Sequence, residues 1–179
     1  MFTIKPLVSY SPLNLYRLEK KPLFFNIIDI VKYPPTGKRS YGLNRAQNYG
    51  FDAEDYFNNW NDNSLIIVQI ETIEAVNNIE NLIAFDEIDG VMIGPYDLSG
   101  SLKVPGKVFH PTVIEASKKV IEACKKVGKS CGTQISDPNK ESLNKLFNYG
   151  YTFAILGSDL FALWNWSQKM HELIKNDKS

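Results

Sequence analysis

The stretch IIVQIET (residues 66–72) is an apolar run of strand length that ends at a carboxylate, Glu71. A second stretch, VMIGPYDLSGS (residues 91–101), repeats this arrangement with an apolar run, a Gly-Pro turn and then Asp97. Continuous apolar runs predict strands that are buried on both faces, as in a parallel sheet. Neighbouring strands lie only about 4.8 Å apart, so we expect the two acids close together at one edge of the sheet.

From residue 64 onward the sequence alternates between strand-like and helix-like patterns. The predicted strands lie in residues 64–71, 88–94, 130–135 and 151–157, and the predicted helices in residues 72–85, 110–129, 137–150 and 158–176. Four repeats of strand and helix predict an α/β fold with a parallel sheet.

A doubly wound sheet and a (β/α)8 TIM barrel share this pattern. The positions of Glu71 and Asp97 favour the barrel, because barrel enzymes carry their functional groups at the carboxyl ends of the strands. A nucleotide-binding fold is less favoured because no glycine-rich phosphate loop follows a strand. A full barrel takes about 250 residues, so the chain is predicted to be one domain, residues 1–179, that forms a truncated or partial barrel, roughly the second half.

The composition narrows the classes of function. The chain has 20 basic and 20 acidic residues and no basic stripe, which argues against nucleic-acid binding. Its apolar runs are shorter than a membrane span, and its N-terminus lacks a secretory pattern, so we expect a cytoplasmic protein. Cys124 and Cys131 are too few for a disulfide framework, and Cys124 falls on the apolar stripe of a predicted helix, where we expect it to pack.

Two carboxylates at one sheet edge match the ligands of a hard divalent cation such as Mg²⁺ or Mn²⁺. Without a cation, the two groups would repel each other. An alternative interpretation is that Glu71 caps the helix that follows it and Asp97 shapes a turn. The spacing of the residues leaves both interpretations open.

Three motifs give the chain a family resemblance: VQIET, IDGVMIGPYDLSGS, and KYPPTGKRSYGLNRAQNYGF at residues 32–51. Together they resemble the metal-dependent (class II) pyruvate aldolases, which include 2,4-dihydroxyhept-2-ene-1,7-dioate aldolase and 2-dehydro-3-deoxyglucarate aldolase, and more distantly the citrate lyase β subunit. The resemblance covers residues 31–163, and residues 1–30 are atypical. It implies a (β/α)8 barrel and a carbon–carbon lyase that cleaves a 2-keto-4-hydroxy acid to pyruvate, or a pyruvate analogue, and an aldehyde.

The resemblance also implies the roles of individual residues. Glu71 and Asp97 would bind a divalent metal ion, Mg²⁺, Mn²⁺ or Co²⁺. Gln69 would lie near the bound keto acid, and the backbone at Tyr96 and Asp97 would receive the substrate carboxylate. The metal would act as a Lewis acid that stabilises the enolate formed when the C3–C4 bond breaks.

Two groups of the family pattern are not found in the sequence: a histidine in an Asp-x-Glu-His segment and an arginine in a Val-Arg-Val-Pro segment. No catalytic residue is therefore assigned. We expect His110 to cap a helix and His171 to lie on the surface, and neither Arg39 nor Arg45 is predicted to replace the arginine. Lys103 stands where the family commonly has glycine. A catalytically degenerate relative or fragment that serves as a binding or assembly subunit is the alternative.

The two ends of the chain carry two further expectations. Residues 2–10 (FTIKPLVSY) match the position of the family's fourth strand, and residues 11–30 fit the usual helix poorly. The apolar residues of the predicted last helix lie on several sides of it rather than in one stripe, which predicts a second packing partner. They are Leu160, Phe161, Leu163, Trp164, Trp166, Met170 and Leu173. Because resembling aldolases exchange their last helices within oligomers, we expect a homo-oligomer formed through the C-terminal helix.

Overall fold

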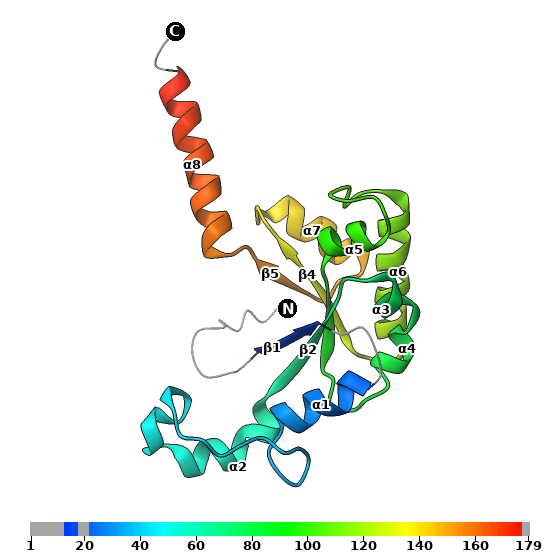
Figure 1. The fold of residues 1–179 in the computed structure, drawn as a ribbon. Coiled ribbons are helices and arrows are strands. Elements are labelled where there is room, and N and C mark those ends of the chain that lie inside the picture. The colour runs from blue at the N-terminus through cyan, green and yellow to red at the C-terminus, as the bar shows by residue number, and fades with distance from the viewer. Residues whose placement is uncertain (1–12, 18–21, 177–179) are drawn as a thin grey trace.

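The structure, a computed structural model, describes residues 13–17 and 22–176 and has a single parallel sheet (Figure 1). Its strands lie side by side in chain order: β1 (Leu13–Arg17), β2 (Leu65–Ile70), β3 (Gly90–Ile93), β4 (Ser130–Ile135) and β5 (Phe153–Leu156). The last four are the predicted strands. The strand expected at residues 2–10 lies outside the described residues. Residues 11–30, which fit the usual helix poorly, contain β1 as well as most of the helix α1 (Pro22–Val31).

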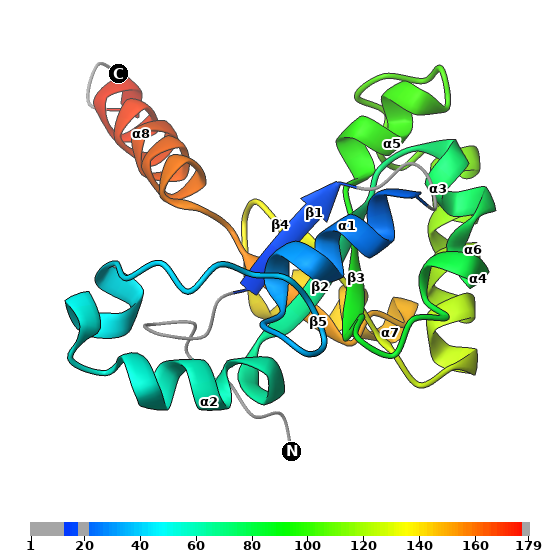
Figure 2. The ribbon, with the colours of Figure 1, turned by 60° about the horizontal axis from the view of Figure 1, so that its bottom comes forward.

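Helices connect the strands, as the sequence pattern predicts. They are α1 (Pro22–Val31), the 3₁₀ helix η1 (Arg45–Gly50), α2 (Ala53–Asn63), α3 (Ile73–Asn77), α4 (Ile79–Leu82), α5 (Pro95–Ser101), α6 (Pro111–Lys126), α7 (Lys140–Tyr149) and α8 (Asp159–Asn176). Figures 1 and 2 show α3, α4 and α6 together on one side of the sheet, whereas α8 projects away from it. None of the helices in the described ranges is both long and apolar enough to cross a membrane.

The hydrophobic core lies between the sheet and the helices on its outer side. Alternate residues of β2, namely Ile66, Val68 and Ile70, are fully buried, as are Val91 and Ile93 of β3. They pack with residues of α6 that recur at helical spacing: Val113, Val120 and Cys124. Cys124 is therefore a packing residue, as predicted.

Two helix boundaries differ from the sequence prediction for local reasons. The helix expected over residues 72–85 is divided at Asn78 into α3 and α4. Helix α7 begins after Asn139 rather than at the Asp-Pro pair, because Asn139 and Ser142 form a reciprocal capping box. Its end at Gly150 is confirmed, and this glycine has the left-handed φ of 112° that favours a residue without a side chain.

The segment after β3 is helical, which corrects the predicted turn. Pro95 occupies the first position of α5, where a missing backbone N–H does no harm and the fixed φ suits a helix. Gly94 is the N-cap, and Asp97 is the third residue of the helix. Asp97 therefore lies in the first turn of α5, not at the end of the strand, and it shapes no turn.

Candidate metal and substrate site

Glu71 directly follows β2 and is buried, with 6% of its surface exposed. The Nε2 amide of Gln69 donates a hydrogen bond of 2.8 Å to Oε2 of Glu71. The alternative in which Glu71 caps the next helix is wrong, because Thr72 Oγ1 accepts the hydrogen bond from the Ala75 N–H at the start of α3. The Glu71 carboxylate thus stays at the end of the strand, held by its neighbour on the same strand face.

Gly94 leaves the space in which these side chains lie. A Cβ atom at this position would lie 3.0 Å from Gln69 Nε2 and 3.2 Å from both Cβ and Oε2 of Glu71. Thr133 Oγ1 on β4 donates a hydrogen bond of 3.0 Å to the carbonyl of Ile93, the residue before Gly94. This bond fixes the end of β3. The Gly-Pro dipeptide therefore places α5 directly against the Glu71 carboxylate.

Asp97 and Tyr96 occupy the first turn of α5 and are exposed. Because this turn is the helix N-terminus, the N–H groups of both residues have no acceptor within the helix. The first intrahelical bond runs instead from the Leu98 N–H to the Gly94 carbonyl, at 3.0 Å. The first turn of α5 thus carries one carboxylate and two backbone N–H donors.

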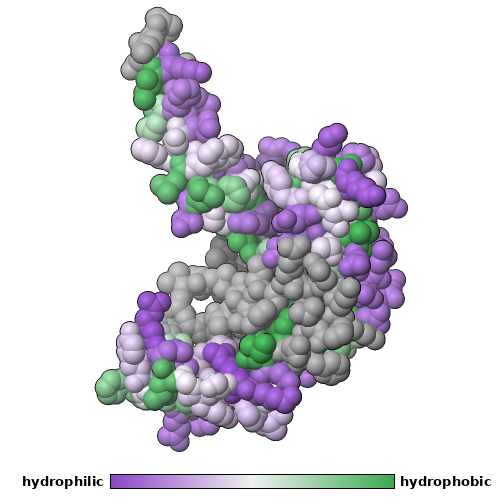
Figure 3. Space-filling model, in the orientation of Figure 1, coloured by the Kyte–Doolittle hydropathy of each residue, from purple (hydrophilic) through white to green (hydrophobic). Residues whose placement is uncertain are grey.

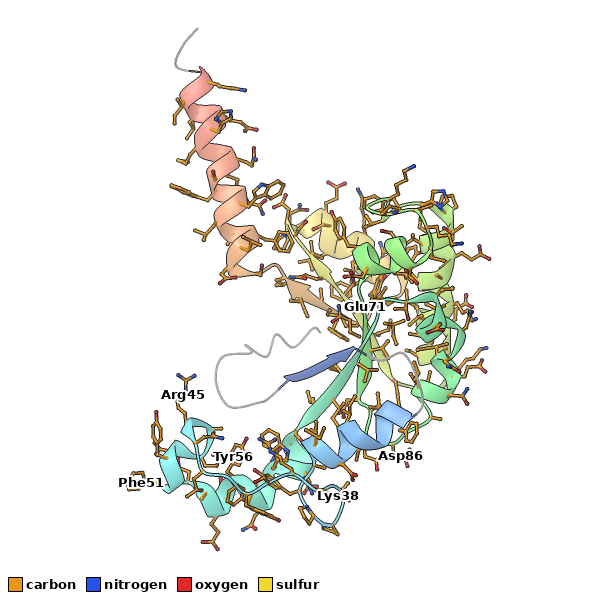
Figure 4. All side chains as sticks on the ribbon, viewed as in Figure 1. Lys38, Arg45, Phe51, Tyr56, Glu71 and Asp86 are labelled. Atoms are coloured by element: carbon orange, nitrogen blue, oxygen red, sulfur yellow. The ribbon has the colours of Figure 1, made fainter. Side chains whose placement is uncertain are left out.

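A cavity of about 160 Å³ at the carboxyl ends of β2, β3 and β4 is lined by three of the predicted site residues, but not by Glu71. Its lining includes Gln69, Tyr96 and Asp97, together with Met92, Ile93, Gly94, Pro95, Gln134, Ser136 and Phe161. Glu71 is next to two lining residues: its Oε2 accepts the Gln69 hydrogen bond, and a Cβ atom at Gly94 would lie 3.2 Å from that oxygen. Figure 4 shows Glu71 at this end of the sheet, far from Arg45 and Phe51 near α2.

Sequence reasoning missed the three lining residues that lie outside the motifs of residues 66–72 and 91–101: Gln134, Ser136 and Phe161. Gln134 is the second-last residue of β4, so the strand-end rule applied to Glu71 would have found it. Its Nε2 donates a hydrogen bond of 3.1 Å to the carbonyl of Gly157. Asn165 Nδ2 of α8 donates a hydrogen bond of 3.1 Å to the carbonyl of Ser136. These bonds tie the beginning of α8, which carries Phe161, to the end of β4.

The donor set fits a hard cation whose coordination is only partly supplied by protein. Glu71 and Asp97 provide carboxylate oxygens, and no group of three or more His, Cys, Asp or Glu side chains occurs among the described residues. Mg²⁺ and Mn²⁺ commonly keep several waters and accept one or two carboxylates plus substrate oxygens. Two carboxylates beside an open cavity match this requirement.

Both histidines, Arg39 and Arg45 are absent from the cavity lining, whereas Arg17, the last residue of β1, is the register partner of the lining residue Gln69. The His110 ring accepts a hydrogen bond from the Thr112 N–H at the start of α6, so it is a capping residue as predicted. His171 is exposed on α8, also as predicted. The Arg39 guanidinium lies 3.8 Å from the Trp60 ring centroid and so belongs to an aromatic cluster around α2.

Lys103, which follows α5, adopts a left-handed φ of 61°. This conformation is unfavourable for a residue with a Cβ atom and easy for glycine. The departure from the family's glycine thus changes the side chain without removing the glycine-like backbone geometry.

Comparisons with known proteins agree with this geometry. Residues 19–165 match the family HpcH/HpaI aldolase/citrate lyase. The chain is 35% identical over 144 residues to 5-keto-4-deoxy-D-glucarate aldolase of Salmonella paratyphi C, and 33% identical to the Citrobacter koseri protein of that name. These alignments cover 80% of this chain and 56% and 55% of the relatives, so the chain spans about half of their length.

Solved structures show the same fold. An HpcH/HpaI aldolase from Desulfitobacterium hafniense superposes with a TM-score of 0.77 at 26% identity, over 90% of this chain and 62% of the other. A family protein from Burkholderia cenocepacia gives a TM-score of 0.79 at 24% identity, over 90% and 64%. The chain belongs to the HpcH/HpaI aldolase/citrate lyase family.

Proposed function

We propose that this protein is a carbon–carbon lyase that cleaves a 2-keto-4-hydroxy acid to pyruvate, or a pyruvate analogue, and an aldehyde. The observation that carries the proposal is the buried Glu71 carboxylate, oriented by Gln69 and facing the helix turn that carries Asp97. Family membership and the aldolases among its relatives support the same activity.

We assign Glu71 and Asp97 as ligands of one divalent cation, with Mg²⁺, Mn²⁺ and Co²⁺ as the candidates. When bound, such an ion supplies Lewis-acid chemistry to the keto oxygen and carboxylate of the substrate. Gln69 keeps one carboxylate oxygen of Glu71 in place through its amide donor. The N–H groups of Tyr96 and Asp97 then receive the substrate carboxylate at the helix N-terminus.

The reaction breaks the C3–C4 bond of the substrate. The 4-hydroxyl group loses its proton as C4 becomes the aldehyde carbon, and the bonding electron pair passes to C3 and gives the enolate of pyruvate. A proton delivered to C3 completes the pyruvate. Neither His110, which caps α6, nor His171, which is exposed on α8, lines the cavity.

We infer that the sheet is part of a (β/α)8 barrel. The five strands are parallel and follow one another in chain order, which is the strand order of a barrel wall. Helices cover the outer side in Figure 1, and the likeness to the aldolase structures extends over 90% of the chain.

We also propose a homo-oligomer formed through α8. Six large apolar residues of this helix are more than half exposed: Leu160, Leu163, Trp164, Trp166, Leu173 and Ile174. Figure 3 shows hydrophobic side chains along the projecting helix. A helix that exposes apolar residues around its circumference is suited to packing against a second copy of the chain. A cytoplasmic location and the absence of a nucleic-acid partner stay predictions from the sequence.

Metal-dependent release of pyruvate from a 2-keto-4-hydroxy acid tests the proposed reaction. We expect release with Mg²⁺, Mn²⁺ or Co²⁺, its loss on addition of a chelator, and its loss in Glu71→Gln and Asp97→Asn. A positioned acid or base is commonly worth about 10²–10⁴-fold, so without the family's histidine the rate should fall below the usual range of about 1–10³ per second. Metal binding with no release of pyruvate at all would favour the alternative, a degenerate relative that acts as a binding or assembly subunit.

A further inference from the structure

Ser101, the last residue of α5, connects this helix to the segment that follows β2. Its Oγ accepts a 2.9 Å hydrogen bond from the N–H of Ile73, although the two residues are 28 positions apart. Ile73 lies two residues after Glu71, and Ser101 lies four residues after Asp97. The bond therefore links the two segments that carry the acids.

A second hydrogen bond joins the same segments on the other side of the acids. The N–H of Gly94 donates a hydrogen bond of 3.0 Å to the carbonyl of Ile70. This bond continues the pairing of β2 and β3 by one residue beyond Ile93. Glu71 thus lies between two anchored residues, Ile70 and Ile73. Asp97 likewise lies between the anchored residues Gly94 and Ser101, so the two hydrogen bonds close a frame around both acids.

Ser99 makes the α5 side of this frame rigid. Its side chain is fully buried. Its Oγ donates a hydrogen bond of 2.6 Å to the carbonyl of Tyr96 and accepts one of 2.9 Å from the N–H of Gly106. The first turn of α5 is thereby fixed to the loop that follows the helix. Ser99 thus holds the first turn of α5, and the hydrogen bond of Ser101 holds its last turn against the segment after β2.

We propose that Ser101 is a positioning residue, which sets the separation of the Glu71 and Asp97 carboxylates through its hydrogen bond to the Ile73 N–H. The inference rests on the proposed function, because it concerns the same pair of metal ligands. Mg²⁺ requires oxygen ligands at about 2.0–2.1 Å in a nearly octahedral arrangement, so a loosened frame weakens the binding of such an ion. Ser101 contacts neither carboxylate, so its effect passes through the backbone of Ile73 and of α5.

The affinity for Mn²⁺ alone, measured by calorimetry on the full chain, tests the inference without relying on turnover. Ser101→Ala removes the acceptor, and Ser101→Cys keeps the volume but offers only a weak sulfur acceptor. We expect both to lower the affinity by about 10-fold, the lower end of the range for groups that hydrogen-bond to a ligand directly. Ser101→Thr keeps the hydroxyl and should retain an affinity close to that of the wild type.

Thr72→Ala is the matched control. Thr72 Oγ1 accepts the Ala75 N–H, so this variant also removes a hydroxyl acceptor from the first turn of α3, but it breaks no link to α5. Its Mn²⁺ affinity should match that of the wild type. Urea unfolding of every variant confirms the folded state, and if Ser101→Ala does not fold, the comparison of Ser101→Cys with Ser101→Thr decides.

Two results would overturn the inference, and they are distinguishable from failure of the proposed site. Wild-type affinity in Ser101→Ala and Ser101→Cys, with binding abolished in Glu71→Gln, would reject the positioning role and leave the metal site intact. An equal loss in Ser101→Ala and Thr72→Ala would show that only the stability of α3 matters. Wild-type affinity in Glu71→Gln would instead reject the metal site itself, and the role of Ser101 with it.

Discussion

Replacing Gly94 with alanine should weaken metal binding while leaving the fold largely intact. The backbone at Gly94 has φ −97° and ψ 89°, which alanine can adopt, so the new methyl group acts through its contacts. It would lie 3.2 Å from Oε2 of Glu71 and 3.0 Å from Nε2 of Gln69. An ordinary contact of about 3.5 Å exceeds the first distance by about 0.3 Å, so the carboxylate must move by about that much.

The consequences for stability and for binding differ in size. Overpacking of a buried site destabilises by about 1–3 kcal/mol, and a Gly→Ala change at a permitted backbone conformation offsets about 0.4–1 kcal/mol. We therefore expect the free energy of unfolding to fall by no more than about 2.6 kcal/mol, which is the largest cost less the smallest offset. Mn²⁺ affinity should fall by about 10–100-fold, because the Gln69–Glu71 pair is displaced.

Gly100→Ala is the matched control for this experiment. Gly100 lies in the same helix, and a Cβ atom there would have no heavy atom within 4 Å apart from its own surroundings in the helix. Its Mn²⁺ affinity should equal that of the wild type, and its stability should rise slightly because alanine favours helices. If calorimetry gave Gly94→Ala the same affinity as Gly100→Ala, the role of Gly94 in seating the Glu71 carboxylate would be refuted.

Three other changes should have measurable effects. Lys32 is buried and its Nζ donates to the carbonyls of Asn61 and Ser64, so Lys32→Met should lower the free energy of unfolding by about 1–3 kcal/mol. Burial lowers the pKa of Lys32 in the folded chain below its ordinary 10.5. Between the folded and unfolded pKa values the unfolded chain therefore binds more protons, so the free energy of unfolding rises with pH in that range. Urea unfolding should show this rise in the wild type relative to Lys32→Met. Lys103→Gly should raise the free energy of unfolding by up to about 1 kcal/mol, because relief of the left-handed strain exceeds the entropic effect of glycine. A lower free energy of unfolding in this variant would contradict this reason. Sedimentation at micromolar concentration should show a dimer or larger species that deletion from Trp164 onward weakens, whereas a monomer unaffected by the deletion would reject the α8 interface.

The sequence predicts the parts of this structure that depend on short-range patterns. The apolar run of β2 and the two-residue spacing of Gln69 and Glu71 place both side chains on one strand face, and their hydrogen bond confirms it. Gly150 and His110 end and begin helices as expected, because capping depends on residues a few positions away.

Features that depend on competing local signals or on distant contacts were harder to predict. A Gly-Pro pair suits a turn as well as a helix start, so the helical placement of Asp97 was missed. Phe161 enters the cavity lining because α8 begins beside β4, where Asn165 bonds to the carbonyl of Ser136. No periodicity within α8 encodes that neighbour.

The most direct test of the metal site is a calorimetric titration of the full chain with Mn²⁺. It compares the wild type with Glu71→Gln and Asp97→Asn, and with Glu74→Gln as a control, because Glu74 is an exposed acid in the first turn of α3. We predict one bound ion in the wild type and in Glu74→Gln. Each of the other two variants should lose more than the roughly 10–100-fold typical of an outer-shell change. Equal affinity in all four proteins would contradict the assignment of Glu71 and Asp97 as the ligands.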